Sequence, residues 1–159
     1  MMIRGNPMLL AFLSLSIALV LAILPMPEVL LPFRPLWLFL VLAFWTLEAP
    51  ERVGLGVAFV FGVLMDLVVG TVLGEYALRL VIFTFLLGRF RARFNFYPGW
   101  QQTLVIGALL VNDRIVAAVV HVATHGATAP WRYWGTVVVT AVLWVPVFAL
   151  LDAIRLRKR

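Results

Sequence analysis

The chain has 159 residues, of which 64% are hydrophobic and only 13% are charged, and its mean hydropathy is +1.07. A soluble domain carries about a quarter charged residues, so the composition excludes a soluble protein and predicts one integral membrane domain over residues 1–159. The chain has no cysteine, which excludes disulfides and thiolate metal sites. The net charge of +6 follows the membrane topology argued below and does not indicate a nucleic-acid partner.

Six apolar runs predict an all-α membrane protein, a bundle of six transmembrane helices. A bilayer core of roughly 30 Å needs about 20 helical residues, and the third, fifth and sixth runs meet that length easily. The second run has fourteen residues and would rise only about 21 Å. The fourth is also short unless it continues to Arg89 or beyond. The predicted spans are residues 8–24, 36–49, 53–73, 76–90, 103–123 and 133–151.

The first run resembles a signal peptide, because Arg4 precedes an apolar stretch. It ends in "LPMPEVLLPFRP", which offers no small-x-small cleavage site. We therefore expect a retained helix.

The distribution of positive charge decides whether the short second run spans the membrane. With six spans and a cytoplasmic N-terminus, nine Lys and Arg residues fall on the inside and two on the outside, which is a strong positive-inside bias. If the second run did not span, everything after it would invert relative to the N-terminus. The C-terminal "RLRKR" is then expected to be a topology anchor in preference to a docking site for a partner or anionic lipid. The inside residues are Arg4, Arg52, Arg89, Arg91, Arg93, Arg155, Arg157, Lys158 and Arg159; the outside residues are Arg34 and Arg132.

Small residues recur at every fourth position of the third run. Such a stripe lets another helix approach closely, which is how helices associate in lipid. The stripe predicts either packing within this bundle or a groove that receives a helix from a partner, and the sequence leaves both open. Its members are Gly54, Ala58, Gly62, Gly70 and Gly74, with Asp66 at the remaining position.

Asp66 lies in an otherwise aliphatic stretch, "GVLMDLVVGTVLG". An acid at the centre of a membrane helix costs about 2.5–3.5 kcal/mol, so it is expected to face protein or water and to have a partner. Arg79 in the fourth run and Asp113 and Arg114 in the fifth are the candidates. We predict an intramembrane charge network of these four residues, with Asp66–Arg79 as its first pair.

Two alternatives to this structural interpretation are an aspartic peptidase and a metal site. Two intramembrane aspartates could serve an aspartic peptidase, but "VNDRIV" at 111–116 has the wrong spacing for the lipoprotein signal peptidase motif, and the second motif of that family is missing. His121 and His125 are one helical turn apart, as two metal ligands would be, but no third ligand is evident. We therefore expect no catalytic residue, no metal and no cofactor.

Residues 33–74, "FRPLWLFLVLAFWTLEAPERVGLGVAFVFGVLMDLVVGTVLG", resemble the MreD family of rod shape-determining proteins. Trp100-Gln101-Gln102 ahead of the fifth run and Asp113 within it fit the same family, whereas Arg79 and Arg114 do not belong to its pattern. The motif positions that carry the resemblance are Arg34, Pro35, Trp37, Pro50 and Arg52, followed by Gly62, Asp66, Gly70 and Gly74.

This resemblance implies a non-enzymatic component of the bacterial inner membrane. The charge distribution described above predicts that both termini lie in the cytoplasm. The resemblance also implies work in the elongation machinery (the elongasome), in which lateral peptidoglycan synthesis sets the rod cell shape. The implied partner is MreC, and through it MreB, RodZ, RodA and the penicillin-binding transpeptidase of RodA. The implied fold is that of the six-helix substrate-binding component of energy-coupling-factor transporters.

The alternative function is a small-molecule or lipid-binding component of a membrane transporter. A transporter component should enclose a pocket of several hundred cubic ångströms with a few polar groups converging on it. A scaffold should be packed inside and expose a groove of small residues. The structure is expected to separate these two.

Overall fold

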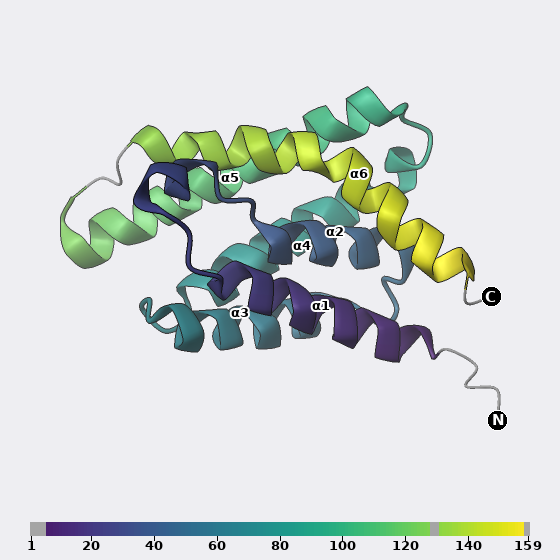
Figure 1. Ribbon diagram of the computed structural model, residues 1–159, viewed down its shortest axis with the longest axis horizontal. Coiled ribbons are helices and arrows are strands. Elements are labelled where there is room, and N and C mark those ends of the chain that lie inside the picture. The colour runs from purple at the N-terminus through teal and green to yellow at the C-terminus, as the bar shows by residue number, and fades with distance from the viewer. Residues whose placement is uncertain (1–5, 128–130, 158–159) are drawn as a thin grey trace.

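A computed structural model describes residues 6–127 and 131–157 of the chain, so Arg4, Lys158 and Arg159 of the predicted topology lie outside the described residues. Every regular element of the described residues is a helix, and no strand occurs among them (Figure 1). The α-helices are α1 (Pro7–Ile23), α2 (Trp37–Glu48), α3 (Leu55–Val69), α4 (Glu75–Phe94), α5 (Gly99–His125) and α6 (Gly135–Arg157). Two 3₁₀-helices, η1 (Glu28–Phe33) and η2 (Trp131–Trp134), precede α2 and α6.

Successive helices run in opposite directions, so both ends of the described chain lie at one end of the bundle (Figure 1). We call this the terminal end. At the opposite end, called the distal end, lie η1, the α3–α4 turn, the last turn of α5 and η2 (Figure 1). This arrangement places Arg52 and the arginines that end α4 and α6 at the terminal end, and Arg34 and Arg132 at the distal end.

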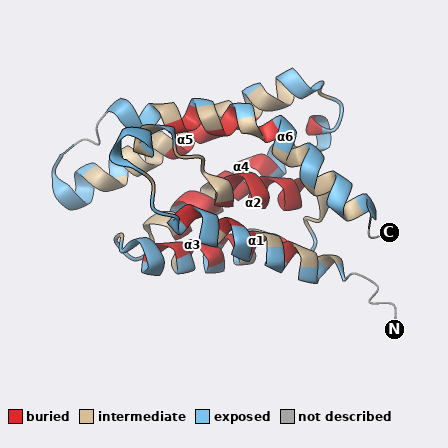
Figure 2. Ribbon diagram, in the orientation of Figure 1, coloured by how far each residue is buried: buried red, intermediate tan, exposed pale blue. Residues whose placement is uncertain are grey.

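Helix α2 forms the centre of the bundle. Every residue from Leu38 to Leu47 is buried, and helices α1, α4 and α6 pack around it (Figure 2). A helix that touches protein on all sides does not have to match the bilayer thickness by itself. This explains how a run of only 12 helical residues is accommodated, with η1 extending the apolar segment to the 21 residues Glu28–Glu48.

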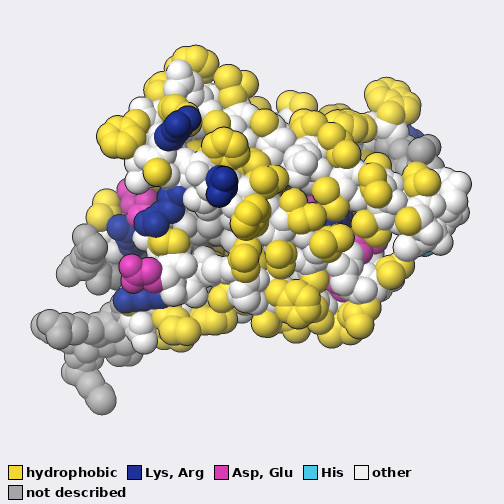
Figure 3. Space-filling view, turned by 180° about the vertical axis from the view of Figure 1, so that it is seen from behind, with side chains coloured by type: hydrophobic (Ala, Val, Ile, Leu, Met, Phe, Trp, Pro, Cys, Tyr) yellow, Lys and Arg dark blue, Asp and Glu magenta, His cyan; other side chains and the backbone are white. Residues whose placement is uncertain are grey.

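Two arginines contact the last residues of α2 at the terminal end. The Arg91 Nε donates a hydrogen bond to the Leu47 carbonyl at 3.0 Å, and Arg155 forms an ion pair with Glu48. The last carbonyls of a helix have no partner within the helix, so the Arg91 contact satisfies one of them. In the space-filling view the Lys and Arg side chains gather toward this end, while hydrophobic side chains cover most of the remaining face (Figure 3).

Among the residues that the structure describes, three segments are long and apolar enough to cross a membrane: Glu28–Glu48, Gly99–His125 and Trp131–Arg157. Helices α1 and α3 are apolar but have only 17 and 15 residues. Helix α4 has 20 residues but carries Glu75, Arg79 and the arginines of its last turns. The chain is a helical membrane protein.

The third predicted span differs from its helix at the distal end, whereas the fourth ends four residues before α4 does at the terminal end. Helix α3 was expected to continue to Leu73 but ends at Val69, because Gly70 adopts a left-handed conformation (φ 74°) that stops a helix. Gly74 is also left-handed (φ 99°) and directly precedes α4. Residues 70–74 therefore form a turn between two helices.

Candidate functional site: the polar cluster at the distal end

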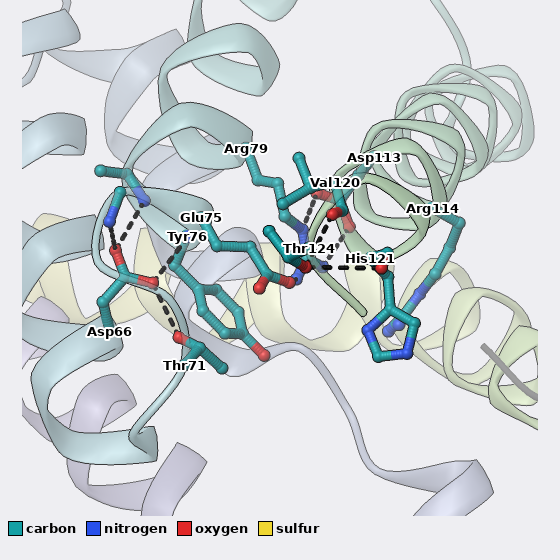
Figure 4. A network of polar contacts seen from close by, with 12 residues as sticks. Asp66, Thr71, Glu75, Tyr76, Arg79, Asp113, Arg114, Val120, His121 and Thr124 are labelled. Carbon is teal, nitrogen blue, oxygen red and sulfur yellow. Dashed lines mark hydrogen bonds and ion pairs between the residues drawn. The ribbon is translucent and has the colours of Figure 1, made fainter. Parts of the chain in front are cut away.

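The Asp66 side chain is buried near the last turn of α3 and accepts four hydrogen bonds from the turn that follows (Figure 4). One comes from the Thr71 hydroxyl at 2.8 Å. The other three come from the backbone N–H groups of Gly74 (2.9 Å), Tyr76 (2.8 Å) and Ala77 (3.4 Å). Both carboxylate oxygens are used.

These bonds make Asp66 the cap of α4. The first N–H groups of a helix lack partners within it, and the residue that precedes α4, Gly74, has no side chain to supply one. A carboxylate at a helix N-terminus also faces the positive end of the helix dipole. An acid in an aliphatic stretch is thus explained by the backbone donors of the next helix, without any basic partner.

The expected Asp66–Arg79 pair is not formed. Arg79 instead makes a two-pronged contact with Asp113 of α5, in which Nε lies 2.8 Å from one carboxylate oxygen and Nη2 lies 2.7 Å from the other. Glu75, one turn earlier on α4, lies 3.7 Å from the same guanidinium, which also lies over the Tyr76 ring at 4.5 Å. Planar guanidinium and carboxylate groups match in this geometry, and the contact ties α4 to α5.

This pairing leaves Arg114 without an acid. Its Nη2 donates to the Thr136 hydroxyl of α6 at 2.7 Å, while its buried Nε has no hydrogen-bond partner. Within residues 6–127 and 131–157, no carboxylate lies within ion-pair distance of Arg114. The predicted network would have paired two acids with two bases. Only one such pair forms, because Asp66 accepts hydrogen bonds from backbone N–H groups and not from an arginine.

Arg114 lines a half-open pocket of about 420 Å³ between η1, α4, α5 and the start of α6. Figure 4 shows the Arg114 and His121 side chains extending in the same direction from α5, as residues seven apart on a helix do. The polar residues that line this pocket, called the arginine pocket below, are Arg34, Glu75, Arg79, Arg114, His121 and Thr136.

The small-residue stripe is divided between two roles. Ala58 and Gly62 are buried, and a Cβ at Gly62 would lie 2.3 Å from the Ala77 Cα of α4, so this part is internal helix packing. Gly54 precedes α3, Gly70 ends it and Gly74 precedes α4. Of the two alternatives that the sequence left open, the contacts of Ala58 and Gly62 agree with internal packing. The other three glycines lie at helix ends, which a four-residue spacing does not distinguish from one face of a helix.

The family-motif residues lie at the two ends of α2. Arg34 and Pro35 lead into it and Trp37 begins it, and all three line a small cavity of about 70 Å³ beside the arginine pocket. Pro50 and Arg52 lie in the turn between α2 and α3. Sequence analysis missed Tyr76 and Thr136, which belong to the polar cluster. Their positions beside Glu75 and at the start of the sixth run were the available signal.

The enzyme and metal interpretations gain no support from the geometry. Asp66 bonds to the α3–α4 turn and Asp113 bonds to Arg79, so each carboxylate has its own donors. The rings of His121 and His125 stack at 4.6 Å. In the part of the chain that the structure describes, no group of three or more His, Asp or Glu side chains could hold a metal ion.

Replacing Asp66 by Ala should lower the free energy of unfolding of the purified protein by at least about 2 kcal/mol. A buried donor without a partner costs about 1–3 kcal/mol, and three backbone N–H groups lose their carboxylate acceptor. Asp66→Asn keeps one acceptor oxygen and should fall between Ala and the parent. Thermal unfolding in detergent, with Asp152→Asn on α6 as the matched control, measures this. An Asp66→Ala protein that melts with the parent would show that the cap contributes nothing.

Comparison with known proteins places this fold in a family. Residues 2–154 match the family described as rod shape-determining protein MreD. The rod shape-determining protein MreD of Haemophilus influenzae is 30% identical over 139 residues, which cover 87% of this chain and 86% of that relative. No solved structure gives a significant match. The chain belongs to the MreD family of rod shape-determining membrane proteins.

Proposed function

We propose that this chain is a non-enzymatic scaffold of the bacterial elongation machinery, which binds MreC and through it MreB, RodZ, RodA and its penicillin-binding transpeptidase. Membership of the family assigns a role in rod shape determination, and the match over residues 2–154 is the observation that carries the proposal. The scaffold would support lateral peptidoglycan synthesis by holding these partners together in the inner membrane.

The same proposal includes six membrane spans with both termini in the cytoplasm. It is supported by the alternation of helix direction and by the arginines at the terminal end, which is the charge asymmetry expected of a cytoplasmic face (Figures 1 and 3). The likeness to the substrate-binding component of energy-coupling-factor transporters also stays a proposal. A solved structure of the chain, superposed on such a component, would test it.

An exposed apolar groove replaces the small-residue stripe as the surface for MreC. It lies where α3, α4 and α5 meet toward the distal end and has a volume of about 450 Å³. Gly74 and Ala77 are among its residues, and small residues let a partner helix approach closely. The partner would be the apolar transmembrane helix of MreC. The exposed side chains of this groove include Phe59, Leu73 and Leu78.

Single cysteines at these three exposed positions should crosslink to the MreC transmembrane helix in membranes, because the natural chain has no cysteine to interfere. Val142→Cys on α6 is the matched control, since Val142 is 65% exposed but lies outside the groove. Crosslinks at Val142 alone would exclude the groove.

The topology has its own test. A membrane-impermeant maleimide should label Leu73→Cys from the periplasmic side only, and labelling of Leu73→Cys from the cytoplasm would invert the topology.

A second candidate function, binding of a small molecule or lipid, is favoured by one observation. The arginine pocket has the size and the converging polar groups expected of a ligand site, whereas Ala58 and Gly62 are packed internally. The two functions are compatible, since a scaffold can carry a ligand site.

A further inference from the structure

We infer that the arginine pocket binds the phosphate of an anionic lipid headgroup. The pocket has an excess of positive charge. Arg34, Arg79 and Arg114 line it, and both nearby carboxylates, Glu75 and Asp113, contact Arg79. Arg34 donates one bond to the backbone carbonyl of Leu24 at 3.3 Å and has no acid within ion-pair distance among the described residues.

Two arginines without counter-ions are costly in a membrane domain. A charged side chain within a membrane segment usually pairs with an opposite charge or a carbonyl, or faces water. Arg114 is held in place by Thr136, and its Nε is removed from solvent without donating to any partner. An anion in the pocket would supply both the charge and the acceptor that the chain lacks. Guanidinium groups suit phosphate in particular, because their fork of donors matches two phosphate oxygens.

The surroundings of the pocket point to a lipid as the source of the phosphate. Its remaining walls are apolar, with Leu31 and Leu36 on the side of η1 and Ala117 on α5. Next to it, η2 carries Trp131, Tyr133 and Trp134, of which Tyr133 lines the pocket itself. Exposed Trp and Tyr side chains mark the headgroup level of a bilayer. The pocket thus lies where lipid phosphates are found and joins a cationic side to an apolar side.

The test uses the full chain in neutral detergent micelles with dioctanoyl phosphatidylglycerol as the probe, measured by native mass spectrometry. Loss of charge-assisted hydrogen bonds to phosphate weakens binding by about tenfold or more, so Arg114→Gln should bind the probe at least about tenfold more weakly than the parent. Arg132→Gln, at an exposed arginine of η2 outside the pocket, should stay within about twofold. Arg34→Gln should also weaken binding and provides a second variant if Arg114→Gln does not fold.

Three further measurements identify what the pocket binds: binding of a neutral lipid, competition by inorganic phosphate, and MreC binding by the Arg114→Gln variant. Neutral dioctanoylglycerol should bind more weakly than the phosphatidylglycerol, and inorganic phosphate should not displace the lipid at matched concentration. Equal binding of the neutral lipid, displacement by inorganic phosphate, or unchanged binding to both arginine variants would overturn the inference. So would loss of MreC binding in Arg114→Gln without any change in lipid binding, because a carboxylate of the partner would then fill the pocket. The lipid readout uses this chain alone and is independent of the proposed MreC scaffold.

Discussion

Asp113→Asn should destabilise the protein by about 3–5 kcal/mol, because it leaves Arg79 as an uncompensated charge inside the bundle. Both side chains are buried, with 1% and 3% exposure, and their two-pronged contact is the polar tie between α4 and α5. Arg79→Gln should lower the free energy of unfolding by a similar amount, because it leaves the buried Asp113 carboxylate without a partner of opposite charge. Thermal unfolding in detergent or the yield of monodisperse protein in size-exclusion chromatography would report both losses.

Two controls separate this effect from general damage. Replacing both partners by leucine should recover much of the lost stability, since a buried pair exchanged for apolar residues is often neutral. Glu48→Gln breaks the Arg155–Glu48 pair, whose side chains are 25% and 21% exposed, and should cost no more than about 1 kcal/mol. If Asp113→Asn and Glu48→Gln lowered stability equally, the buried pair would not be the tie described here.

Gly62→Val should separate α3 from α4. Even a Cβ at this position would lie 2.3 Å from the Ala77 Cα and 2.7 Å from its backbone nitrogen, and backbone atoms cannot move aside as a flexible side chain can. Overpacking costs about 1–3 kcal/mol, and we expect the upper end of that range or more, because Ala77 also donates to Asp66. Displacing α4 would therefore weaken the cap as well.

Gly107→Ala is the matched control for this substitution. Gly107 lies on α5, where a Cβ would meet the Ala141 Cβ at an ordinary 3.7 Å. Thermal unfolding of Gly62→Ala, Gly62→Val and Gly107→Ala should therefore show a graded loss at residue 62 and a change of less than about 0.5 kcal/mol at residue 107. A stable Gly62→Val protein would mean that α3 and α4 are not packed as closely as described.

Hydropathy predicted the bounds of the first two helices closely. The first and second spans, 8–24 and 36–49, differ from α1 and α2 by one residue at each end. The third span runs past the end of α3, because Gly70 ends that helix through its backbone conformation. The fourth and sixth spans end four and six residues before α4 and α6, and the fifth begins four residues after α5, because these helices continue into polar residues. The spacing of Gly70 and Gly74 after Asp66 was the available sign of a capped turn.

The pairing of charges could not be predicted from the sequence. Arg79 and Asp113 are separated by 34 residues, and their contact depends on how α4 and α5 are rotated against each other. Hydropathy places both residues in the membrane but does not say which acid faces which base. It also gives no hint that backbone donors would satisfy Asp66 and so leave Arg114 unpaired.

Co-purification tests the central claim, that this chain is a scaffold for MreC, most directly. Full-length MreC and this chain would be expressed together, extracted in mild detergent and purified through a tag on this chain. We expect the two proteins to elute from size exclusion as one complex, and Leu73→Glu in the exposed apolar groove to release MreC while Val142→Glu on α6 retains it. Elution of MreC apart from a folded, monodisperse parent chain would contradict the account.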